Sequence, residues 1–287
     1  MGYFPDGYGP AVYDIYFDNA RGCAEGLVEA CSRFFTPGAR ILDVGAGTGN
    51  VSCEAARRFA GCSIVGVDID EGALDLARHK AAEYALGNVE FESGNALRLP
   101  YADNTFDAVL ANQVVGGPAD QRKMLSEMLR VVRPDGGVGV AKSNPDFNEV
   151  MQWINDVALE MTSRRGIDPP PLEQNPWMNT LPLSSMLEQL GVRGTTRQRF
   201  ISAQTDFSTF LINVMTQGRN LLELVEYVTQ CDAGDQAAQT RGCWEFLQIG
   251  KELLDRKYGG KLEVSSEVVS GTKVEQRVPA RAAHLRV

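Results

Sequence analysis

The chain has 287 residues, of which 44% are hydrophobic and 23% charged, so it can bury a sizeable core and is expected to form one ordinary domain with an insertion or lid. Its 28 basic and 37 acidic residues give a formal net charge of -9. This charge excludes the strong positive field that nucleic acid or anionic lipid would require, so neither partner is expected. No run approaches the length of a membrane span and no signal-peptide pattern opens the sequence, so the expected location is cytoplasmic.

The cysteine and histidine content predicts no metal centre. The cysteines are widely spaced, without a C-x-x-C pair, and the sequence has only two histidines to complete a ligand set. We expect reduced, mostly buried thiols at Cys23, Cys31, Cys53, Cys62, Cys231 and Cys243.

The first 39 residues combine an aromatic, glycine-rich arm with a helix expected over residues 19–35, which Pro37-Gly38 terminates. The arm is rich in tyrosines, among them Tyr8, Tyr13 and Tyr16. These rings either anchor the arm against the domain or cover a bound ligand.

A glycine-rich turn follows, and the rest of the chain is organised around it. An apolar run that includes Asp43 is followed by Gly45, Gly47 and Gly49, and a helical pattern begins at once. This is the pattern of a buried strand that turns sharply into a helix. Because glycine lets a ligand approach the backbone and a helix N-terminus carries positive partial charge, the turn predicts a site for a nucleotide-like ligand.

A second apolar strand, residues 63–68, ends in Asp68, which lies 23 positions after Gly45. A carboxylate at this place can accept hydrogen bonds from the two hydroxyls of an adenosine ribose. Asp70 precedes an amphipathic helix and is therefore predicted to be its N-cap.

Three further strands are expected over residues 89–93, 106–111 and 138–142, with helical patterns between them. The third strand opens into Asn95-Ala96, and the fourth is followed by Asn112 and Gln113. Strands that alternate with helices predict an α/β fold with a doubly wound, parallel sheet, whose ligand lies at the carboxyl ends of the strands.

The alternation stops after Ser143. Residues 143–260 are expected to form lid and substrate-specificity helices, interrupted by a sixth strand near 195–201. A final strand is expected within 261–275, and residues 276–287 form a basic tail. The helices are surplus to the core, so they are expected to cover the substrate.

Four motifs together resemble the class I S-adenosylmethionine-dependent methyltransferases. They lie at residues 42–49 (LDVGAGTG), 66–68 (GVD), 99–107 (LP followed by FD) and 130–137 (RVVRPDGG), in that family's order and spacing. The resemblance implies a Rossmann-like, doubly wound and mostly parallel seven-stranded sheet with an antiparallel seventh strand and a helical lid. It implies S-adenosylmethionine as cofactor and S-adenosylhomocysteine as product.

The resemblance also assigns residues, with the N-terminal arm and helix covering the cofactor. Asp43 would orient the turn and meet the amino end of the methionine moiety, Asp68 would hold the ribose, and Asn95 would reach the adenine edge, although the family more often has an acid there. The full set of expected cofactor contacts is Asp43, Gly45, Ala46, Gly47, Gly49, Asp68, Ile69, Asn95, Ala96 and Asn112.

Methyl transfer from a sulfonium is an in-line displacement that proximity and exclusion of water can promote. Many relatives that methylate oxygen use a histidine base, but His79 lies mid-helix between basic residues and His284 lies in the tail, so a histidine base is not expected. The remaining catalytic candidates are Asn112, Gln113, Tyr13, Asp14 and acids of the lid.

The leading hypothesis is a methyltransferase that acts on a small molecule, such as a specialised metabolite. The protein could act as a homodimer. The alternatives are an enzyme that keeps the cofactor for another step, such as a cyclisation, and a non-catalytic cofactor-binding partner protein. Side chains expected to line the substrate pocket, or else to pack the lid on the core, are Tyr8, Tyr16, Trp153, Trp177, Met178, Phe207, Phe210 and Asn213.

Overall fold

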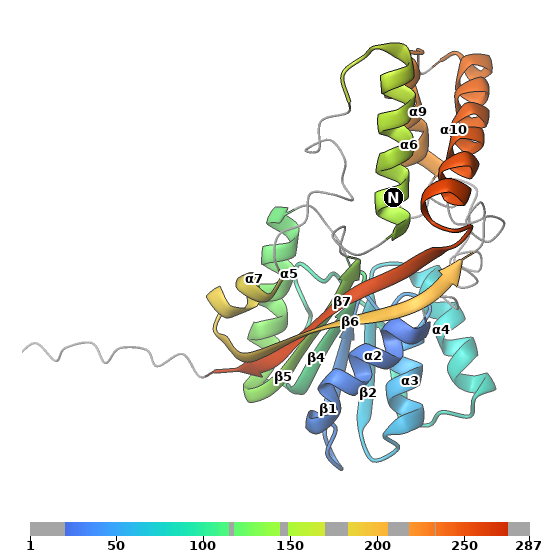
Figure 1. Ribbon diagram of the computed structural model, residues 1–287. Coiled ribbons are helices and arrows are strands. Elements are labelled where there is room, and N and C mark those ends of the chain that lie inside the picture. Colours follow the sequence, from blue (N-terminus) through green and yellow to red (C-terminus); the bar gives the residue numbers. More distant parts are fainter. Residues whose placement is uncertain are drawn as a thin grey trace, which may run out of the picture.

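The computed structural model describes residues 21–114, 118–143, 149–169, 183–205, 218–232 and 234–274. These residues contain one seven-stranded sheet with the strand order β3-β2-β1-β4-β5-β7-β6 (Figure 1). The strands are β1 (Arg40–Val44), β2 (Ser63–Asp68), β3 (Val89–Ser93), β4 (Phe106–Asn112), β5 (Val132–Ser143), β6 (Val192–Thr205) and β7 (Leu262–Lys273).

The first five strands pair in parallel, and β7 runs antiparallel between β5 and β6. The predicted α/β class, the doubly wound sheet and the antiparallel seventh strand are therefore confirmed. The sixth strand is longer than the expected 195–201, because β6 pairs with β7 from Val192↔Lys273 to Thr205↔Leu262. The register shifts between Arg193 and Thr196 and between Ile201 and Ala203, so a long partner strand extends β6 beyond the residues that its own sequence pattern marks despite two irregularities.

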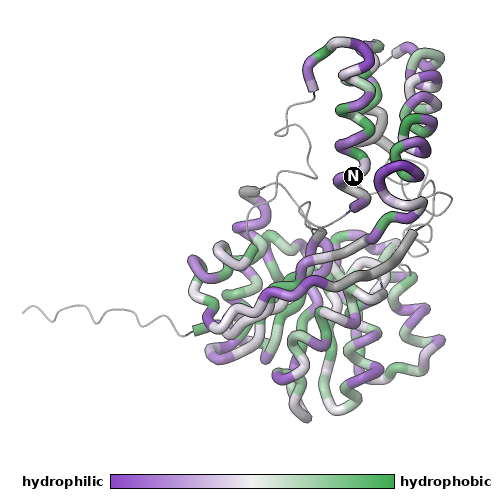
Figure 2. The backbone as a smooth tube through the Cα atoms, in the orientation of Figure 1, coloured by the Kyte–Doolittle hydropathy of each residue, from purple (hydrophilic) through white to green (hydrophobic). Residues whose placement is uncertain are grey.

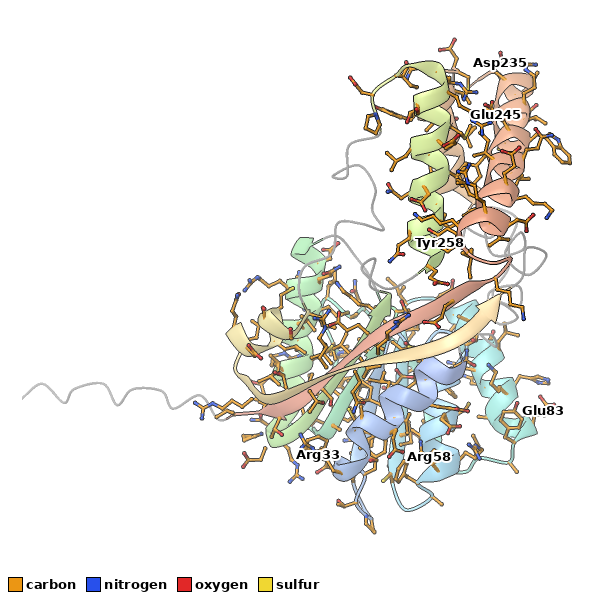
Figure 3. All side chains as sticks on the ribbon, viewed as in Figure 1. Arg33, Arg58, Glu83, Asp235, Glu245 and Tyr258 are labelled. Atoms are coloured by element: carbon orange, nitrogen blue, oxygen red, sulfur yellow. The ribbon has the colours of Figure 1, made fainter. Side chains whose placement is uncertain are left out.

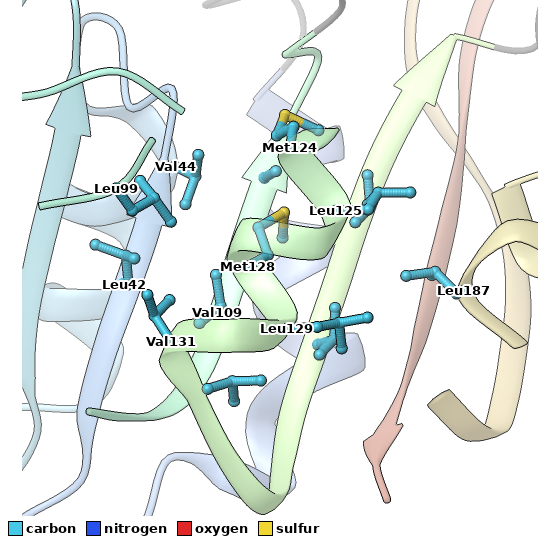
Figure 4. Packing of buried hydrophobic residues seen from close by; sticks show 14 of the residues in the cluster. Leu42, Val44, Leu99, Val109, Met124, Leu125, Met128, Leu129, Val131 and Leu187 are labelled. Carbon is cyan, nitrogen blue, oxygen red and sulfur yellow. The ribbon is translucent and has the colours of Figure 1, made fainter. Parts of the chain in front are cut away.

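Helices cover both faces of this sheet. The helices α2 (Arg21–Cys31), α3 (Asn50–Arg58) and α4 (Glu71–Glu83) lie on one face, and α5 (Pro118–Val131) and α7 (Leu183–Gln189) lie on the other. Figure 4 shows how α5 buries Met124, Leu125 and Met128 against Leu42 and Val109 of the sheet. The parallel strands are thus apolar on both faces, and a polar ligand site is left only at their ends.

The N-terminal helix α2 packs on the sheet, with Leu27 and Val28 in the same apolar cluster as Ile41. Its expected role in covering the cofactor site stays a prediction. Its first turn comes closest to the ligand edge, where the thiol of Cys23 contacts Asn112. The arm before it, residues 1–20, lies outside the described residues.

Three helices form a separate lobe, which Figure 1 shows rising beyond the carboxyl ends of the parallel strands. They are α6 (Glu149–Arg165), α9 (Gly218–Thr229) and α10 (Gln236–Lys257). Hydrophobic and hydrophilic residues alternate along them in Figure 2, as expected for helices that pack on one another. The lobe therefore has an apolar core of its own, around Trp153, Phe246 and Leu253.

The lobe is fixed to the sheet where β7 begins. The carboxylate of Glu149, in α6, accepts a hydrogen bond of 2.6 Å from the backbone N–H of Glu263 in β7. Within the lobe, Asp156 Oδ2 accepts one of 2.5 Å from Tyr258 Oη and joins α6 to the end of α10. Figure 3 places Tyr258 at the end of α10 that meets the sheet and Asp235 at the far end. Asp235 is the N-cap of α10, so each end of this long helix is held by a carboxylate.

No helix in the described ranges is long and apolar enough to cross a membrane. The six cysteines are free thiols, four of them buried and two, Cys231 and Cys243, partly exposed, which agrees with the expected unpaired, mostly buried thiols.

Candidate active site

The glycine turn joins β1 to α3 at the carboxyl edge of the sheet. The backbone N–H groups of Gly45 and Ala46 donate to Val67 O at 2.7 and 3.0 Å, and the N–H of Gly47 donates to Asp68 Oδ2 at 2.8 Å. All three glycines have left-handed backbones, with φ values of 70, 53 and 82° for Gly45, Gly47 and Gly49. The turn is therefore tied to the end of β2, which fixes the relative positions of the two strand ends.

The three glycines serve different purposes. A Cβ on Gly45 would lie 2.2 Å from Val114 Cγ2, and a Cβ on Gly49 would lie 2.8 Å from Ala77 Cβ, so packing requires glycine at both positions. At Gly47, no described atom outside the adjoining residues lies within 4 Å of the place that a Cβ would occupy. Gly47 is thus the glycine whose open side suits a ligand that approaches the backbone.

Asp43, in β1, is 2% exposed and lies beneath this turn. Its Oδ2 accepts a hydrogen bond of 2.6 Å from Ser52 Oγ, whereas Oδ1 is buried and has no donor among the described residues. Burial raises the pKa of Asp43 to about 7, against the lowering effect of the Ser52 hydroxyl, and the nearby charge of Asp68 raises it further. A buried carboxylate oxygen of this kind is suited to receive a cationic group from a ligand.

Asp68 ends β2 and is half-buried. Its Oδ2 holds the N–H of Gly47 and its Oδ1 accepts from the N–H of Asp70 at 3.0 Å. Asp70 Oδ1 accepts from the N–H of Ala73 at 3.1 Å, which confirms the predicted N-cap of α4. Ile69, between the two acids, is 63% exposed, a large apolar side chain at the ligand edge.

Asn95 follows β3 and is exposed. Its Oδ1 accepts a hydrogen bond of 2.8 Å from the N–H of Leu97, and its carbonyl accepts from Arg98 N, so the side chain closes its own turn. Ala96 packs against the apolar layer under the edge. Because the acceptor oxygen serves the turn, the NH₂ group is the part of Asn95 best able to meet a ligand.

Asn112 is the last residue of β4 and Gln113 follows it, and both join a polar network with α2 and β7. Cys23 Sγ contacts Asn112 Oδ1 at 3.2 Å, and Gln113 Nε2 donates to Ser266 Oγ at 2.9 Å. Gln113 also has a left-handed backbone, φ 57°, fixed by its N–H to Ala141 O at 2.8 Å. These contacts hold the segment that places Val114 over Gly45, so the two amides position backbone, and neither is a proton acceptor of the strength that a general base needs.

The lobe contains one of the expected pocket-lining residues within the described ranges. Trp153 is fully buried, stacks edge-on against Phe246 at 5.6 Å between ring centroids, and donates from Nε1 to Gly250 O at 2.9 Å. It is a core residue of the lobe, the alternative considered from the sequence, and not a pocket-lining one. The other candidates lie outside the described residues, and they are Tyr8, Tyr13, Asp14, Tyr16, Trp177, Met178, Phe207, Phe210 and Asn213.

Sequence reasoning missed several buried polar residues near this edge. Ser52 lies on the apolar face of α3, and Lys142 interrupts the apolar run of β5. For both Ser52 and Lys142, the sequence offers one indication, which is a polar residue among the apolar residues of a helix or strand. Cys23 and Ser266 carried no such signal, because their roles depend on contacts with Asn112 and Gln113, which are distant in the sequence.

The residues at this edge fit adenosine joined to an amino acid better than they fit a dinucleotide. The turn has the pattern G-x-G-x-G, and the third glycine caps α3 with Asn50 following it. The buried Oδ1 of Asp43 suits an ammonium group, while a pyrophosphate would be repelled by the carboxylates of Asp43 and Asp68.

Comparison with known proteins agrees with this reading of the edge. Residues 35–180 match the model of a family described as a methyltransferase domain. Over 97 residues the chain is 45% identical to a demethylmenaquinone methyltransferase of Deinococcus radiodurans, a match that covers 34% of this chain and 40% of the relative. The matched segments span less than half the length of the curated relatives.

Two solved structures share the fold at low identity. The YcgJ protein of Bacillus subtilis is 17% identical with a TM-score of 0.53, over 86% of this chain and 99% of that one. The Haemonchus contortus phosphoethanolamine N-methyltransferase 2, solved with S-adenosyl-L-methionine, is 18% identical with a TM-score of 0.51, over 93% of this chain and 57% of that one.

The fold and the glycine-turn edge define a class I S-adenosylmethionine-dependent methyltransferase fold. The chain belongs to the methyltransferase domain family, whose model covers half of its length, and its cofactor is S-adenosylmethionine.

Proposed function

We propose that this protein transfers a methyl group from S-adenosylmethionine to a small organic acceptor. The observation that carries the proposal is the buried Oδ1 of Asp43, which has no donor among the described residues and lies beneath a turn that leaves Gly47 open. The bound cofactor would supply an electrophilic methyl group on a sulfonium.

Each part of the edge has a role in this proposal. Asp43 accepts from the ammonium of the methionine moiety, and Asp68, already fixed by two N–H groups, orients the ribose hydroxyls. Ile69 and Ala96 offer apolar surface to the adenine, and the NH₂ group of Asn95 meets its edge. Gly45, Ala46, Gly47 and Gly49 form the floor, and Asn112 borders it.

The acceptor is proposed to be a small molecule for two reasons. The charge of -9 opposes binding to a nucleic acid, and the three-helix lobe stands beyond the strand ends where an acceptor would meet the cofactor. The relative from Deinococcus radiodurans is named for demethylmenaquinone, which supports a small aromatic ring among the acceptors to be tested.

Catalysis in this proposal depends on alignment and exclusion of water. In the described residues His79 is exposed on α4, away from the strand ends, and Asn112 and Gln113 are committed to positioning. An aligned acceptor held in a water-poor space gains most of its rate from proximity.

The test is incubation of the purified chain with S-adenosylmethionine bearing a labelled methyl group and a panel of phenols, quinols, carboxylic acids and amines. Labelled acceptor together with S-adenosylhomocysteine supports methyl transfer. A rearranged acceptor with unchanged cofactor supports a cyclisation instead, and cofactor binding without turnover of any acceptor supports a partner protein. Asp68→Ala is the matched control, because it should abolish labelling at low cofactor concentration.

A further inference from the structure

Three polar side chains from distant segments of the chain meet beside the end of β4. Gln113 Nε2 donates to Ser266 Oγ of β7 at 2.9 Å and lies 3.9 Å from Cys23 Sγ of α2, and the Ser266 hydroxyl also forms a hydrogen bond with this thiol. Cys23 is fully buried and Ser266 is 3% exposed. Because buried polar groups need partners, the mutual contacts of these three residues fix how each side chain is oriented.

Gln113 reaches across the end of β5 to bond with Ser266. Asn112, the last residue of β4, pairs with Ala141 of β5, and Ser143 at the end of β5 pairs with Ser266 of β7. Two strand spacings correspond to about 10 Å, which an extended glutamine and a serine span together with the hydrogen bond between them. The bond therefore ties the end of β4 to a strand that is not its neighbour in the sheet.

The backbone of Gln113 is held in a conformation that is unfavourable for a residue with a Cβ. Its φ is 57°, in the left-handed region, and its N–H donates to Ala141 O at 2.8 Å. A residue of this kind stays in that region only where its surroundings impose it. The N–H bond restrains the backbone of Gln113 and the amide bond restrains its side chain, so loss of the Ser266 hydroxyl removes one of these two restraints.

The conformation of Gln113 decides where the next residue lies. Val114 packs so closely on Gly45 that a Cβ there would overlap both methyl groups of the valine. Gly45 begins the glycine turn, and its own N–H is bonded to Val67 O at 2.7 Å. If Gln113 relaxed, Val114 would move off Gly45 and the turn would lose a packing contact that limits its dihedral angles. A site that is less preorganised binds its ligand more weakly.

We infer that Ser266 is a positioning residue for the cofactor, and that it acts through Gln113 and Val114 on the glycine turn. The inference rests on the proposed function, since it takes S-adenosylmethionine as the ligand of the turn. Among the described residues, the side chain of Ser266 bonds to Gln113 and Cys23 and to no residue of the turn. Its effect on the cofactor is therefore indirect, and it changes the affinity for the cofactor through the shape of the turn.

Ser270 offers a matched comparison on the same strand. It is 2% exposed, and its Oγ donates to Ala30 O of α2 at 3.3 Å and bonds to Thr196 Oγ1 at 2.9 Å. Four positions separate it from Ser266, so both serines lie on the face of β7 that α2 covers, about 13 Å apart along the strand. Each serine buries a hydroxyl between β7 and α2, but only Ser266 is linked to the turn.

The first experiment measures the binding of S-adenosylhomocysteine by calorimetry and the Tm on the same preparations. Ser266→Ala and Ser270→Ala each remove one buried hydroxyl, so both should lower the Tm by similar amounts. We expect Ser266→Ala to weaken S-adenosylhomocysteine about fivefold, while Ser270→Ala stays within about twofold of the original protein. Ser266→Thr keeps the hydroxyl and should also stay within about twofold.

Substitutions of Gln113 test the path of this effect. Gln113→Ala loses the amide and keeps a Cβ at a φ of 57°, so it should weaken S-adenosylhomocysteine about fivefold or more. Gln113→Gly should lose less affinity, because glycine adopts this φ without strain. In the Gln113→Ala protein, the further change Ser266→Ala should leave the affinity as it is, because the link is already broken.

Hydrogen exchange of the free protein examines the turn without any ligand. The amides of Gly45 and Gly47 are bonded to Val67 O and to the carboxylate of Asp68. We expect them to exchange several-fold faster in Ser266→Ala than in the original protein, and at the original rate in Ser270→Ala.

The inference is overturned if Ser266→Ala binds S-adenosylhomocysteine as tightly as the original protein, or if Ser270→Ala weakens it equally. It is also overturned if the losses caused by Ser266→Ala and Gln113→Ala add. Failure of the original protein to bind S-adenosylhomocysteine would instead defeat the proposed function. The exchange rates of the turn would then decide the role of Ser266, and equal rates in Ser266→Ala and the original protein would exclude it.

Discussion

The two ends of the ligand edge are built in different ways. At β1 and β2 the site consists of contacts that are short in sequence, such as Ser52 to Asp43 and Gly47 to Asp68, which are 9 and 21 positions apart. At β4, β5 and β7 the contacts join distant segments, such as Cys23 to Asn112 and Gln113 to Ser266, which are 89 and 153 positions apart. The proposed cofactor side is thus a local motif, and the proposed acceptor side is assembled by the whole fold.

This difference indicates which changes each side tolerates. A local motif of backbone hydrogen bonds depends on a few dihedral angles, so single substitutions there affect binding directly. The acceptor side and the lobe depend on packing, so substitutions there affect stability first. The following predictions test this separation.

The largest effect is expected in the lobe. Trp153→Ala should lower the free energy of unfolding by about 4 kcal/mol, because it removes a fully buried indole and its bond to Gly250 O. Chemical denaturation measures this change, and calorimetry should find the affinity for S-adenosylhomocysteine within about threefold of the original. Trp153→Phe, which loses mainly the hydrogen bond, should cost about 1 to 2 kcal/mol. If Trp153→Ala also weakened cofactor binding, the expected separation between stability effects in the lobe and binding effects in the glycine turn would be contradicted.

Within the turn, Gly45→Ala and Gly47→Ala should differ. The first should cost about 3 kcal/mol of unfolding free energy, because its Cβ would overlap Val114 and its φ is 70°. The second should cost about 1 kcal/mol for its φ of 53°, since its Cβ meets no described atom within 4 Å, yet lower cofactor affinity about tenfold. Denaturation and calorimetry on the same preparations check both, and equal effects of the two variants would refute the distinct roles.

Asp68→Ala should weaken S-adenosylhomocysteine about a hundredfold, because charge-assisted hydrogen bonds to the ribose and the anchor of Gly47 N are both lost. Calorimetry gives the dissociation constant, and Asp70→Ala is the control, since it removes only the cap of α4 and should lower stability by about 1 kcal/mol. An undiminished affinity of Asp68→Ala would remove this residue from the site.

The pH dependence of stability should show the buried carboxyl of Asp43. Burial raises its pKa to about 7 in the folded protein, well above the ordinary range of an aspartate, so the folded state keeps a proton that the unfolded state has released. Its contribution to stability is complete below about pH 4 and is lost as pH rises to about 7. We expect the free protein to lose about 1 kcal/mol between about pH 6 and 7, and Asp43→Asn to remove this slope.

Saturating S-adenosylhomocysteine should also flatten that slope, because its ammonium favours the ionised carboxylate and releases the proton on binding. Calorimetry in buffers of different ionisation enthalpy measures the released proton near pH 7. A binding reaction with no proton release at about pH 6.5 would show that Asp43 does not meet the ammonium group.

The smallest effect is expected for His79→Ala. The side chain is exposed on α4, so stability should change by less than about 0.5 kcal/mol and the rate of methyl transfer should be unaffected. A large loss of rate would restore histidine as a catalytic candidate.

The difference between contacts that are local in sequence and contacts between distant segments also explains which features the sequence could predict. The alternation of strands and helices, the glycine turn and the cap at Asp70 depend on neighbouring residues, and the structure confirms them. The structure places Asp43 and Asp68 beside one another as their positions at strand ends imply, while their roles toward the cofactor remain predictions.

The rest depends on tertiary contacts that no local pattern records. Trp153 is equally compatible with a pocket or a core until Gly250 is placed beside it, 97 positions later in the chain. The commitment of Gln113 to Ser266 likewise requires β7 to return next to β5. The resemblance assigns Asn95 to the adenine edge, whereas in the structure its side-chain Oδ1 accepts a hydrogen bond from Leu97 N–H within its own turn.

The pairing of β6 with β7 has a consequence for how this protein can change over evolution. Thr205 and Leu262, the residues that leave and re-enter the sheet around α9 and α10, are paired neighbours. A short hairpin could therefore join them and leave every strand in register. The segment between Thr205 and Leu262, which contains α9 and α10, is therefore an insertion attached at two adjacent points of the sheet. During evolution this insertion could be replaced by another that binds a different acceptor, without a change in the residues proposed to bind the cofactor.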